Sequence, residues 1–491
     1  MRLEKLIEHI PYIKREGEDK EILSISTDSR TCVENSLFIC LKGGNVDAHD
    51  RVNEAVRNGA VAVISERELP MTEMVSQVVV ENSRLALSLI ASAFYMQPSK
   101  HLKIIGITGT NGKTTTSYML ASILEKAGKR VGIIGTLGIK YAGKIMKSEL
   151  TTPDPIILQK TLADMVIHDV EYVVMEISAH AIYYNKIAGI EFIACIFTNL
   201  TQDHLDFFQS MDAYRQTKIQ LFRDYDMSLA ILNGDDKTGR EIAKFCEKHD
   251  VKTIFYGLHT PSEAFAVVTN ETLVGIDGML NINDKLCRVS LPMTGKHNIY
   301  NALAAASCAV EMGIPIETVG EGLNTMKCIA GRLEFVGGIS SAYIYVDFAH
   351  TPDGLEKSLK SLKTHCKGRL VCLFGCGGNR DKGKRSLMGE VAAKNSDFAV
   401  LTSDNPRYED PLDIISEIEK GYRHFSVQYV VVPDRKRAIE YAVNSLKKED
   451  VLLIAGKGAE EYQEIMGIKY PFNDKDIIEK ILKVKGNNPL I

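Results

Sequence analysis

The stretch "GITGTNGKTTT" carries residue types suited to binding phosphate. Gly109 and Gly112 let the backbone approach phosphate oxygens, and a helix that follows would present free N–H groups at its first turn. Lys113 is placed to reach the β- and γ-phosphates of a nucleoside triphosphate, and Thr114 to bind Mg²⁺. The strict G-x-x-x-x-G-K-[ST] spacing fails, because Ile107 stands at its first glycine. A plain glycine-rich turn is the alternative, but a strand before and a helix after favour phosphate binding.

Acidic and imidazole side chains follow two later apolar runs. Glu176 ends "EYVVMEIS", and "TNLTQDHLD" contains Asp203, His204 and Asp206. A carboxylate and an imidazole at neighbouring strand ends could hold a divalent metal near phosphates. Each residue alone could be a cap or a structural side chain, but together they favour a metal site. Lys218 lies on a predicted helix, where spacing alone indicates a solvated surface lysine.

The stretch "FAVLTSDNPRYEDP" places an acid, an amide and a guanidinium beside a proline, directly after an apolar run. Asp and Asn-Pro are common in turns, so a plain turn is one interpretation. The position is also the carboxyl end of a predicted strand, where doubly wound α/β folds bind ligands. From residue spacing alone, this segment could be either a plain turn or a substrate-binding loop.

The elements that would position these residues are apolar strands alternating with helices. Continuous apolar runs such as "LKIIGI", "EYVVMEIS", "RLVCLFG" and "VLLIAG" are typical of parallel strands buried on both faces. We therefore predict an α/β fold of three domains. Their expected ranges are 1–100 for an N-terminal α/β domain, 101–334 for a central P-loop ATPase-like parallel-sheet domain, and 335–491 for a C-terminal Rossmann-like doubly wound domain.

Composition narrows the class of protein. A chain of 491 residues with 45% hydrophobic and 25% charged residues is typical of a soluble globular protein with about three domains. With a net charge of −4, the chain as a whole has no positive field that would attract nucleic acid or a membrane surface. The ten cysteines form no CxxC pair, so neither a zinc knuckle nor a disulfide framework is indicated. The N-terminus lacks an apolar signal segment and no run of about 18 apolar residues occurs, so we expect a cytoplasmic protein.

Motifs along the chain resemble those of the Mur ligases. "GITGTNGKTT", "FTNLTQDHLD", "YRQTKIQLF", "GKHNIYNALAA", "AGRLEFV", "VDFAHTPDGLE", "FGCGGNRDKGKR", "DNPR" and "GKGAEEYQ" occur in that family's order, over essentially the whole length. The early "STDSRTCVENSLFICLKGG" is similar to the family's nucleotide-sugar domain. The resemblance implies an ATP-dependent amide ligase of peptidoglycan precursor synthesis that works through an acyl phosphate. The branch that it resembles adds meso-diaminopimelate to UDP-MurNAc-L-Ala-D-Glu, and we expect a monomer without nucleic-acid or membrane partners.

The resemblance also implies roles for individual residues. For ATP it implies Thr110, Asn111, Gly112, Lys113, Thr114, Thr115, Asn298, Asn301, Arg332 and Asp347. For Mg²⁺ it implies Thr114, Glu176, His204 and a carbamylated Lys218, and the catalytic set is Lys113, Glu176, His204 and Lys218. For the UDP-MurNAc-dipeptide it implies Thr27, Ser29, Thr151, Thr152, Ser178, Tyr184 and Lys186. For meso-diaminopimelate it implies Arg385, Asp404, Asn405, Pro406, Arg407, Gly456 and Glu460.

The chemistry of the amine substrate agrees with this last set. Meso-diaminopimelate has a distal carboxylate that suits a bidentate guanidinium such as that of Arg407. Lysine lacks that carboxylate, so a site built for meso-diaminopimelate would leave Arg407 unpaired.

Five positions depart from the family pattern: Ala179, Tyr184, Lys186, Phe208 and Ala459. Ordinary drift with compensation is favoured over a changed acceptor. Two other readings stay open: a related ligase of different specificity, such as a folylpolyglutamate-like enzyme, and an ATP-binding relative without turnover. The intact "DNPR" with Arg385 argues against a folate substrate. Intact Lys113, Glu176, His204 and Lys218 argue against a relative without turnover.

Overall fold

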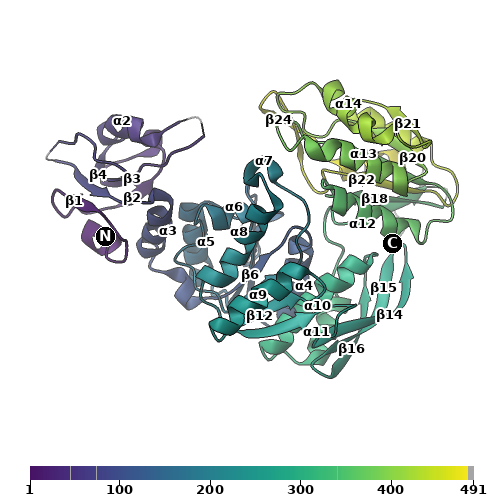
Figure 1. The fold of residues 1–491 in the computed structure, drawn as a ribbon, viewed down its shortest axis with the longest axis horizontal. Helices are drawn as coiled ribbons and strands as arrows, with labels where there is room; N and C mark the ends of the chain where they lie inside the picture. Colours follow the sequence, from purple (N-terminus) through teal and green to yellow (C-terminus); the bar gives the residue numbers. More distant parts are fainter. Residues whose placement is uncertain (45, 73, 340, 485–491) are drawn as a thin grey trace. The chain divides into compact units, whose positions relative to one another are not determined.

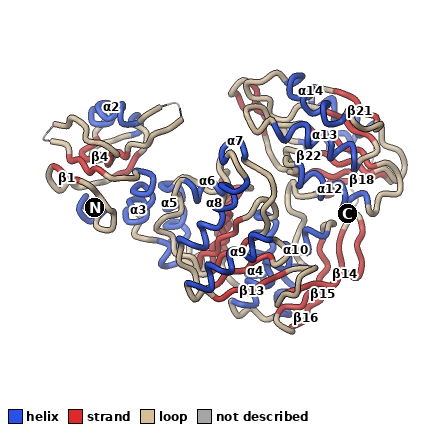
Figure 2. The backbone as a smooth tube through the Cα atoms, in the orientation of Figure 1, coloured by secondary structure: helices blue, strands red, loops and turns tan. Residues whose placement is uncertain are grey.

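The structure, a computed structural model, describes residues 1–44, 46–72, 74–339 and 341–484. The chain divides into two compact units. The first comprises Met1–Thr108, Lys129–Cys195 and Thr217–Leu229, and the second comprises Gly109–Gly128, Ile196–Gln216 and Ala230–Ile491. Strands alternate with helices through most of the sequence, as Figure 2 shows, so the predicted α/β class is confirmed.

The N-terminal part of the first unit is a five-stranded sheet in the order β1-β5-β4-β3-β2. Strands β2 to β5 pair in parallel, and β1 pairs antiparallel with β5. Apolar side chains of this sheet and of α3 form a buried core. Asn82 caps α3 by accepting from the N–H groups of Arg84 and Leu85. The elements are β1 (Lys14–Glu16), β2 (Ser24–Ser26), β3 (Ser36–Ile39), β4 (Ala60–Ser65), β5 (Ser76–Val79), α1 (Leu3–Leu6), α2 (Val52–Arg57), α3 (Ser83–Phe94) and the 3-10 turns η1 (Ser29–Thr31), η2 (Ala48–Arg51) and η3 (Pro98–His101).

The rest of the first unit contains strands in the order β6-β10-β7-β8-β9. Strand β10 lies between β6 and β7 and is parallel to both, while β8 and β9 extend the edge antiparallel. These elements are β6 (Lys103–Thr108), β7 (Val131–Gly135), β8 (Gly138–Tyr141), β9 (Lys144–Met146), β10 (Tyr172–Glu176), α5 (Pro155–Ile167) and α6 (Ala179–Tyr183). All five residues of β10 are buried, as its continuous apolar run predicts.

Three elements cross a boundary between the units: β11 (Ala194–Phe197), α8 (Met211–Asp224) and β12 (Leu229–Asn233). In the second unit the strand order continues from β12 as β13-β14-β15-β16, and the last three strands form an antiparallel meander that the sequence analysis did not predict. The elements are β13 (Lys252–Tyr256), β14 (Ala264–Thr272), β15 (Gly275–Ile282), β16 (Lys285–Leu291), α4 (Lys113–Lys126), α7 (Leu205–Phe208), α9 (Lys237–Lys248), α10 (Lys296–Glu311) and α11 (Ile316–Asn324).

The C-terminal part of the second unit is a six-stranded sheet in the order β17-β18-β22-β19-β20-β21, parallel except for β17 (Figure 1). Helices α12, α13 and α14 contribute to one hydrophobic core of the sheet, and α15 and α16 to another. This is the predicted doubly wound pattern. The elements are β17 (Glu334–Ile339), β18 (Ala342–Asp347), β19 (Leu370–Phe374), β20 (Phe398–Leu401), β21 (Gln428–Val431), β22 (Val451–Ala455), β23 (Tyr462–Ile465), β24 (Ile468–Pro471), α12 (Pro352–Lys363), α13 (Gly383–Asn395), α14 (Pro411–Tyr422), α15 (Arg435–Asn444) and α16 (Asp474–Val484).

Across the described residues, no helix combines the length and apolar character that crossing a membrane requires.

Candidate active site

The predicted phosphate loop leads into α4, which begins at Lys113. Gly112 has φ +88°, a left-handed conformation that glycine adopts without strain. Lys113 Nζ donates to the carbonyls of Gly109 at 2.8 Å and Thr110 at 2.9 Å, so the ammonium lies over its own loop. The loop therefore presents a positive charge at a helix N-terminus, which is the arrangement that attracts phosphate.

The residues assigned to the nucleotide form contacts with this loop within the second unit. Arg332 donates through Nη2 to Thr114 Oγ1 at 2.9 Å, and its guanidinium stacks 4.6 Å from the Phe348 ring centre. Asn301 donates to Asn298 Oδ1 at 3.2 Å, so these two amides are also joined. Asn301 in turn accepts from the hydroxyl of Thr116 on α4 at 3.4 Å. The arginine and both amides therefore connect to the first turns of α4 through hydrogen bonds.

Asp347, also assigned to the nucleotide, is buried at the end of β18. Its carboxylate accepts from the N–H groups of Leu333 at 2.5 Å and Ala349 at 2.9 Å, and from Ser358 Oγ at 3.1 Å. Burial raises the pKa of Asp347, and these three donors oppose that shift. Its carboxylate fixes the backbone on both sides of the strand end.

Glu176 ends β10 in the first unit and is fully buried. Its carboxylate accepts from the N–H and the hydroxyl of Thr136, each at 3.0 Å. Thr152, assigned to the dipeptide substrate, donates to the Glu176 carbonyl at 2.9 Å and accepts from the N–H of Ser178 at 3.0 Å. Thr151 lies 3.1 Å from the Thr136 hydroxyl. The structure thus joins the predicted metal ligand to three predicted substrate residues.

Thr136 is a residue that the sequence analysis missed. It directly follows β7, so the only available signal was its place at the end of the run "RVGIIGT". Its two donors hold the Glu176 carboxylate in a fixed orientation.

Lys218 on α8 is nearly fully buried, with 1% of its surface exposed. The surface interpretation that spacing alone gave is therefore wrong. An uncompensated ammonium is costly to bury, so this lysine needs either charge partners or chemical modification. Carbamylation would remove the positive charge, and it stays a prediction.

His204 stands at φ +54° immediately before α7, and Asp203 lies beside it. Its Nε2 is 3.3 Å from Asp203 Oδ2, and His350 Nε2 is 4.0 Å from the same oxygen. Burial alone would raise the pKa of Asp203, but the nearby charges of His350 and His204 hold it below its usual value. Within the described part of the chain, no three His, Cys, Asp or Glu side chains gather in a metal-binding group. The predicted set has only two such side chains, so this observation does not test it.

Two departures from the family pattern have partners in the first unit. Lys186 Nζ lies 2.6 Å from Asp154 Oδ1, and the Arg84 guanidinium stacks 4.2 Å from the ring centre of Tyr184. Ser29 donates to Glu54 at 2.7 Å. Thr27, the other residue assigned to the uridine, is partly exposed directly after β2.

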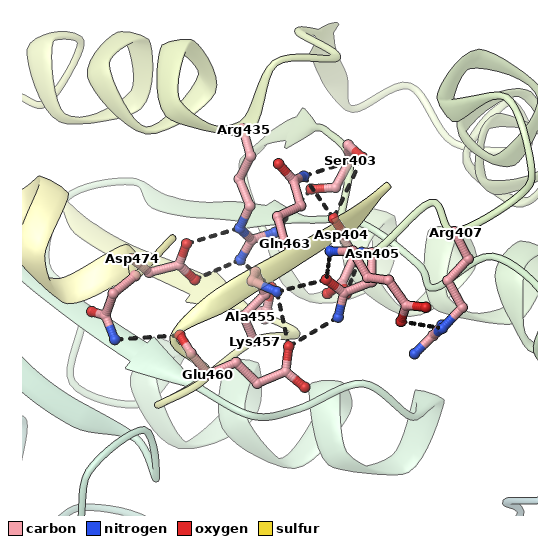
Figure 3. Close-up of polar contacts among 12 residues, drawn as sticks. Ser403, Asp404, Asn405, Arg407, Arg435, Ala455, Lys457, Glu460, Gln463 and Asp474 are labelled. Atoms are coloured by element: carbon pink, nitrogen blue, oxygen red, sulfur yellow. Dashed lines mark hydrogen bonds and ion pairs between the residues drawn. The ribbon is translucent and has the colours of Figure 1, made fainter. Parts of the chain in front are cut away.

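The amine loop, residues 404–407, follows β20 in the C-terminal sheet (Figure 3). Asn405 donates to Glu460 Oε2 at 2.9 Å, which joins the loop to the segment after β22. Gly456 has φ +112°, and a Cβ there would lie 2.5 Å from Asp404 Oδ2. The structure therefore brings together Asp404, Asn405, Gly456 and Glu460.

Arg407 completes this group at φ +52°. Its Nε donates to Glu464 Oε2 at 3.0 Å and its Nη1 to the Gly378 carbonyl at 2.8 Å. These contacts engage Nε and Nη1 of the guanidinium, and the side chain is 18% exposed. Its Nη2 makes no hydrogen bond to any described residue.

Arg385, also assigned to the amine substrate, takes part in buried ion pairs. Its side chain is fully buried and pairs with Glu409 at 2.9 Å and Glu417 at 3.0 Å, and it donates to the Gly377 carbonyl at 3.2 Å. The hydrogen bond from Arg385 lowers the pKa of Glu409 to about 2. A guanidinium with two carboxylate partners in the interior is placed to hold loops together, and the direct contact of Arg385 with substrate stays a prediction.

Comparisons with known proteins agree with this geometry. Three Mur ligase descriptions match: "Mur ligase family, catalytic domain" over residues 21–95, "Mur ligase middle domain" over 107–309, and "Mur ligase, glutamate ligase domain" over 331–458. The UDP-N-acetylmuramoyl-L-alanyl-D-glutamate--2,6-diaminopimelate ligase of Caldanaerobacter subterraneus subsp. tengcongensis is 40% identical over 482 residues, covering 98% of this chain and 99% of that protein. The ligase of the same name from Bacillus velezensis is 38% identical over 486 residues, covering 97% and 98%.

Comparisons with solved structures agree with these sequence comparisons. The structure of a UDP-N-acetylmuramoyl-L-alanyl-D-glutamate--2,6-diaminopimelate ligase is 28% identical with a TM-score of 0.70, covering 99% of this chain and all of that one. A folylpolyglutamate synthase from Mycobacterium tuberculosis, 16% identical with a TM-score of 0.65 and covering 83% of this chain and 96% of that one, shares the fold alone. The fold and the phosphate loop define an α/β nucleotide-dependent ligase. The chain belongs to the Mur ligase family, whose members are ATP-dependent amide ligases.

Proposed function

We propose that this chain uses ATP to join meso-diaminopimelate to the D-glutamyl carboxylate of UDP-MurNAc-L-Ala-D-Glu in peptidoglycan precursor synthesis. The observation that carries the proposal is the assembly of Asp404, Asn405, Arg407 and Glu460 at the carboxyl ends of β20 and β22. Two relatives named as 2,6-diaminopimelate ligases, similar over nearly the whole length, support it further.

The proposed amine site matches the two charged groups at the distal end of meso-diaminopimelate. The Nη edge of Arg407 suits the distal carboxylate, since a guanidinium binds a carboxylate through two parallel hydrogen bonds. Glu460, whose side chain is 26% exposed, and Asp404 would meet the distal ammonium. Lysine would offer no carboxylate to Nη2 of Arg407, and such a polar mismatch can discriminate by roughly 10⁴-fold.

The ATP phosphates are proposed to lie on residues 110–115, with Lys113 supplying positive charge next to them. The remaining nucleotide contacts are proposed for Asn298, Asn301, Arg332 and Asp347. The proposed Mg²⁺ donors are Thr114, Glu176, His204 and carbamylated Lys218. Most of these donors are oxygen atoms, which Mg²⁺ prefers. Glu176 and Lys218 are both buried, and a buried carboxylate or carbamate needs a positive partner such as this cation. Bound Mg²⁺ would neutralise negative charge on the phosphates.

The reaction follows from the weakness of a carboxylate as an electrophile at neutral pH. Transfer of the γ-phosphoryl group of ATP to an oxygen of the glutamyl carboxylate forms an acyl phosphate and releases ADP. The α-amine of meso-diaminopimelate then attacks its carbonyl carbon, a tetrahedral intermediate forms, and phosphate leaves as the amide is made. The protein contributes positioning and charge stabilisation, and no covalent enzyme intermediate is required.

The domain ranges 1–100, 101–334 and 335–491 are also proposals, supported by family matches over 21–95, 107–309 and 331–458. The proposed acceptor contacts are Thr27, Ser29, Thr151, Thr152, Ser178, Tyr184 and Lys186. The intramolecular partners of Tyr184 and Lys186 support compensated drift.

The test is phosphate release from ATP with UDP-MurNAc-L-Ala-D-Glu as acceptor. Meso-diaminopimelate and L-lysine are compared as amines, and the product mass is measured. Turnover with meso-diaminopimelate and none with lysine is expected. Absence of product with meso-diaminopimelate, while ATP still binds, would refute the assignment and direct the search to another acceptor.

A further inference from the structure

Lys457 is a buried lysine that none of the predicted roles uses. Its side chain is 0% exposed, and it follows Gly456 directly after β22. Because a buried ammonium needs charge-assisted partners, the groups that it contacts indicate what it does.

Lys457 closes a ring of three hydrogen bonds with two residues of the proposed amine site (Figure 3). Its Nζ donates to Asn405 Oδ1 at 3.0 Å and to Glu460 Oε2 at 2.8 Å. Asn405 Nδ2 donates to the same Glu460 oxygen at 2.9 Å. Each member of the ring contacts the other two.

This ring fixes the orientation of both partners. Asn405 Oδ1 also accepts from the N–H of Glu464 at 2.9 Å, so two donors require the oxygen on that side and direct the amide nitrogen to Glu460. Glu460 Oε2 accepts both ring hydrogen bonds, and this leaves Oε1 outside the ring. Because the Glu460 side chain is 26% exposed, its second oxygen can accept from a ligand while the first is held by the ring.

We infer that Lys457 is a positioning residue that, with Asn405 as its second partner, orients Glu460 toward the ammonium of the incoming amino acid. This inference rests on the proposed function. Without the Lys457 ammonium, Glu460 would lose a charge-assisted hydrogen bond and Asn405 would lose one of the two donors that set its amide. Misplacement of binding groups by about 1 Å can lower turnover by about 100-fold.

The test compares Lys457→Met with Lys469→Met. Both ammonium groups approach the same Tyr462 ring, at 5.6 Å and 4.9 Å from its centre, but only Lys457 belongs to the ring of hydrogen bonds. For Lys457→Met we expect the KM for meso-diaminopimelate to rise about 10- to 100-fold, with the KM for ATP within about twofold of wild type. Lys469→Met should leave both values unchanged.

A second variant separates positioning from stability. Lys457→Met with Glu460→Gln removes both charges, so the folded state should be recovered even if the single variant unfolds. Glu460→Gln alone should also raise the KM for meso-diaminopimelate, because Glu460 belongs to the proposed site. We expect the double variant to match the KM of Glu460→Gln, since Lys457 acts through Glu460, and a further rise would overturn the inference. A Lys457→Met enzyme with a KM for meso-diaminopimelate within twofold of wild type would overturn the inference alone, as would an equal rise in the KM for ATP. A wild-type enzyme that makes no product with meso-diaminopimelate would overturn the proposed function and this inference together.

Discussion

Replacing Arg435 by methionine should strongly destabilise the edge of the C-terminal sheet that carries the amine loop. Arg435 and Asp474 are both 0% exposed and pair through two hydrogen bonds, of 2.8 and 2.7 Å (Figure 3). Arg435 also donates to the Ala455 carbonyl at 3.0 Å. Methionine would leave a buried carboxylate without its partner, and breaking such a pair costs about 3 to 5 kcal/mol. At about 1.4 kcal/mol per factor of ten, this is about 10²- to 10⁴-fold in the local opening equilibrium.

Hydrogen exchange of the amides in β20 and β22 is the suitable assay, because unfolding of a chain with several domains is not a single two-state transition. Those amides should exchange about 10²- to 10⁴-fold faster in Arg435→Met. Adding Asp474→Asn should recover much of the loss, since it removes the unpaired charge. Lys363→Met is the matched control: it breaks an ion pair with Asp397 whose side chains are 45% and 40% exposed, and should cost at most about 1 kcal/mol. An increase below tenfold in Arg435→Met, or no recovery in the double variant, would refute this reasoning.

Three further outcomes follow from the contacts described. Glu409→Gln should remove up to about 3 kcal/mol of local stability above pH 4.5, measured by hydrogen exchange of the amides in β20. Because the pKa of Glu409 is lowered from 4.5 to about 2, the difference from wild type should vanish as pH falls through that window. Gly456→Ala should raise the KM for the amino acid at least tenfold, since φ is +112° and its Cβ would meet Asp404; unchanged kinetics would contradict this. Thr136→Val should raise the half-saturating Mg²⁺ concentration about fivefold, for about 1 kcal/mol of lost hydrogen bonding to Glu176, and Thr136→Ser should restore it.

The fold was predictable where burial leaves a plain pattern in the sequence. Strands β10 and β22 are buried throughout, so each reads as a continuous apolar run. The antiparallel strand β15 alternates between buried and partly exposed residues, and the Asn283-Asp284 turn that joins it to β16 is a weak hairpin signal that was not interpreted. The hairpin of β23 and β24 is short and mostly exposed, so it carries almost no apolar pattern.

The candidate site was likewise predictable only in part. Residue types at strand ends indicated Glu176 and Asp404, because parallel strands bring their carboxyl ends to one edge. The burial of Lys218 and Lys457 could not be predicted, since a charged side chain gives no sign of its surroundings. The ion pair of Arg385 with Glu417 could not be predicted either. Glu417 lies 32 residues away on α14, and only the packing of α13 against α14 brings the two side chains together.

Buried charge at this edge of the sheet serves a purpose that an apolar core could not. Strands β20 and β22 are followed by Asp404 and Gly456 respectively, and the carbonyls of Ser403 and Ala455 just before them need donors. Arg435 reaches both carbonyls, the first in a long contact of 3.4 Å, while Asp474 balances its charge. An apolar side chain would give similar packing but would leave both strand ends free to shift. One guanidinium therefore ties together the two backbone positions from which the amine-binding residues project, and the specificity of the proposed site depends on groups that never touch the substrate.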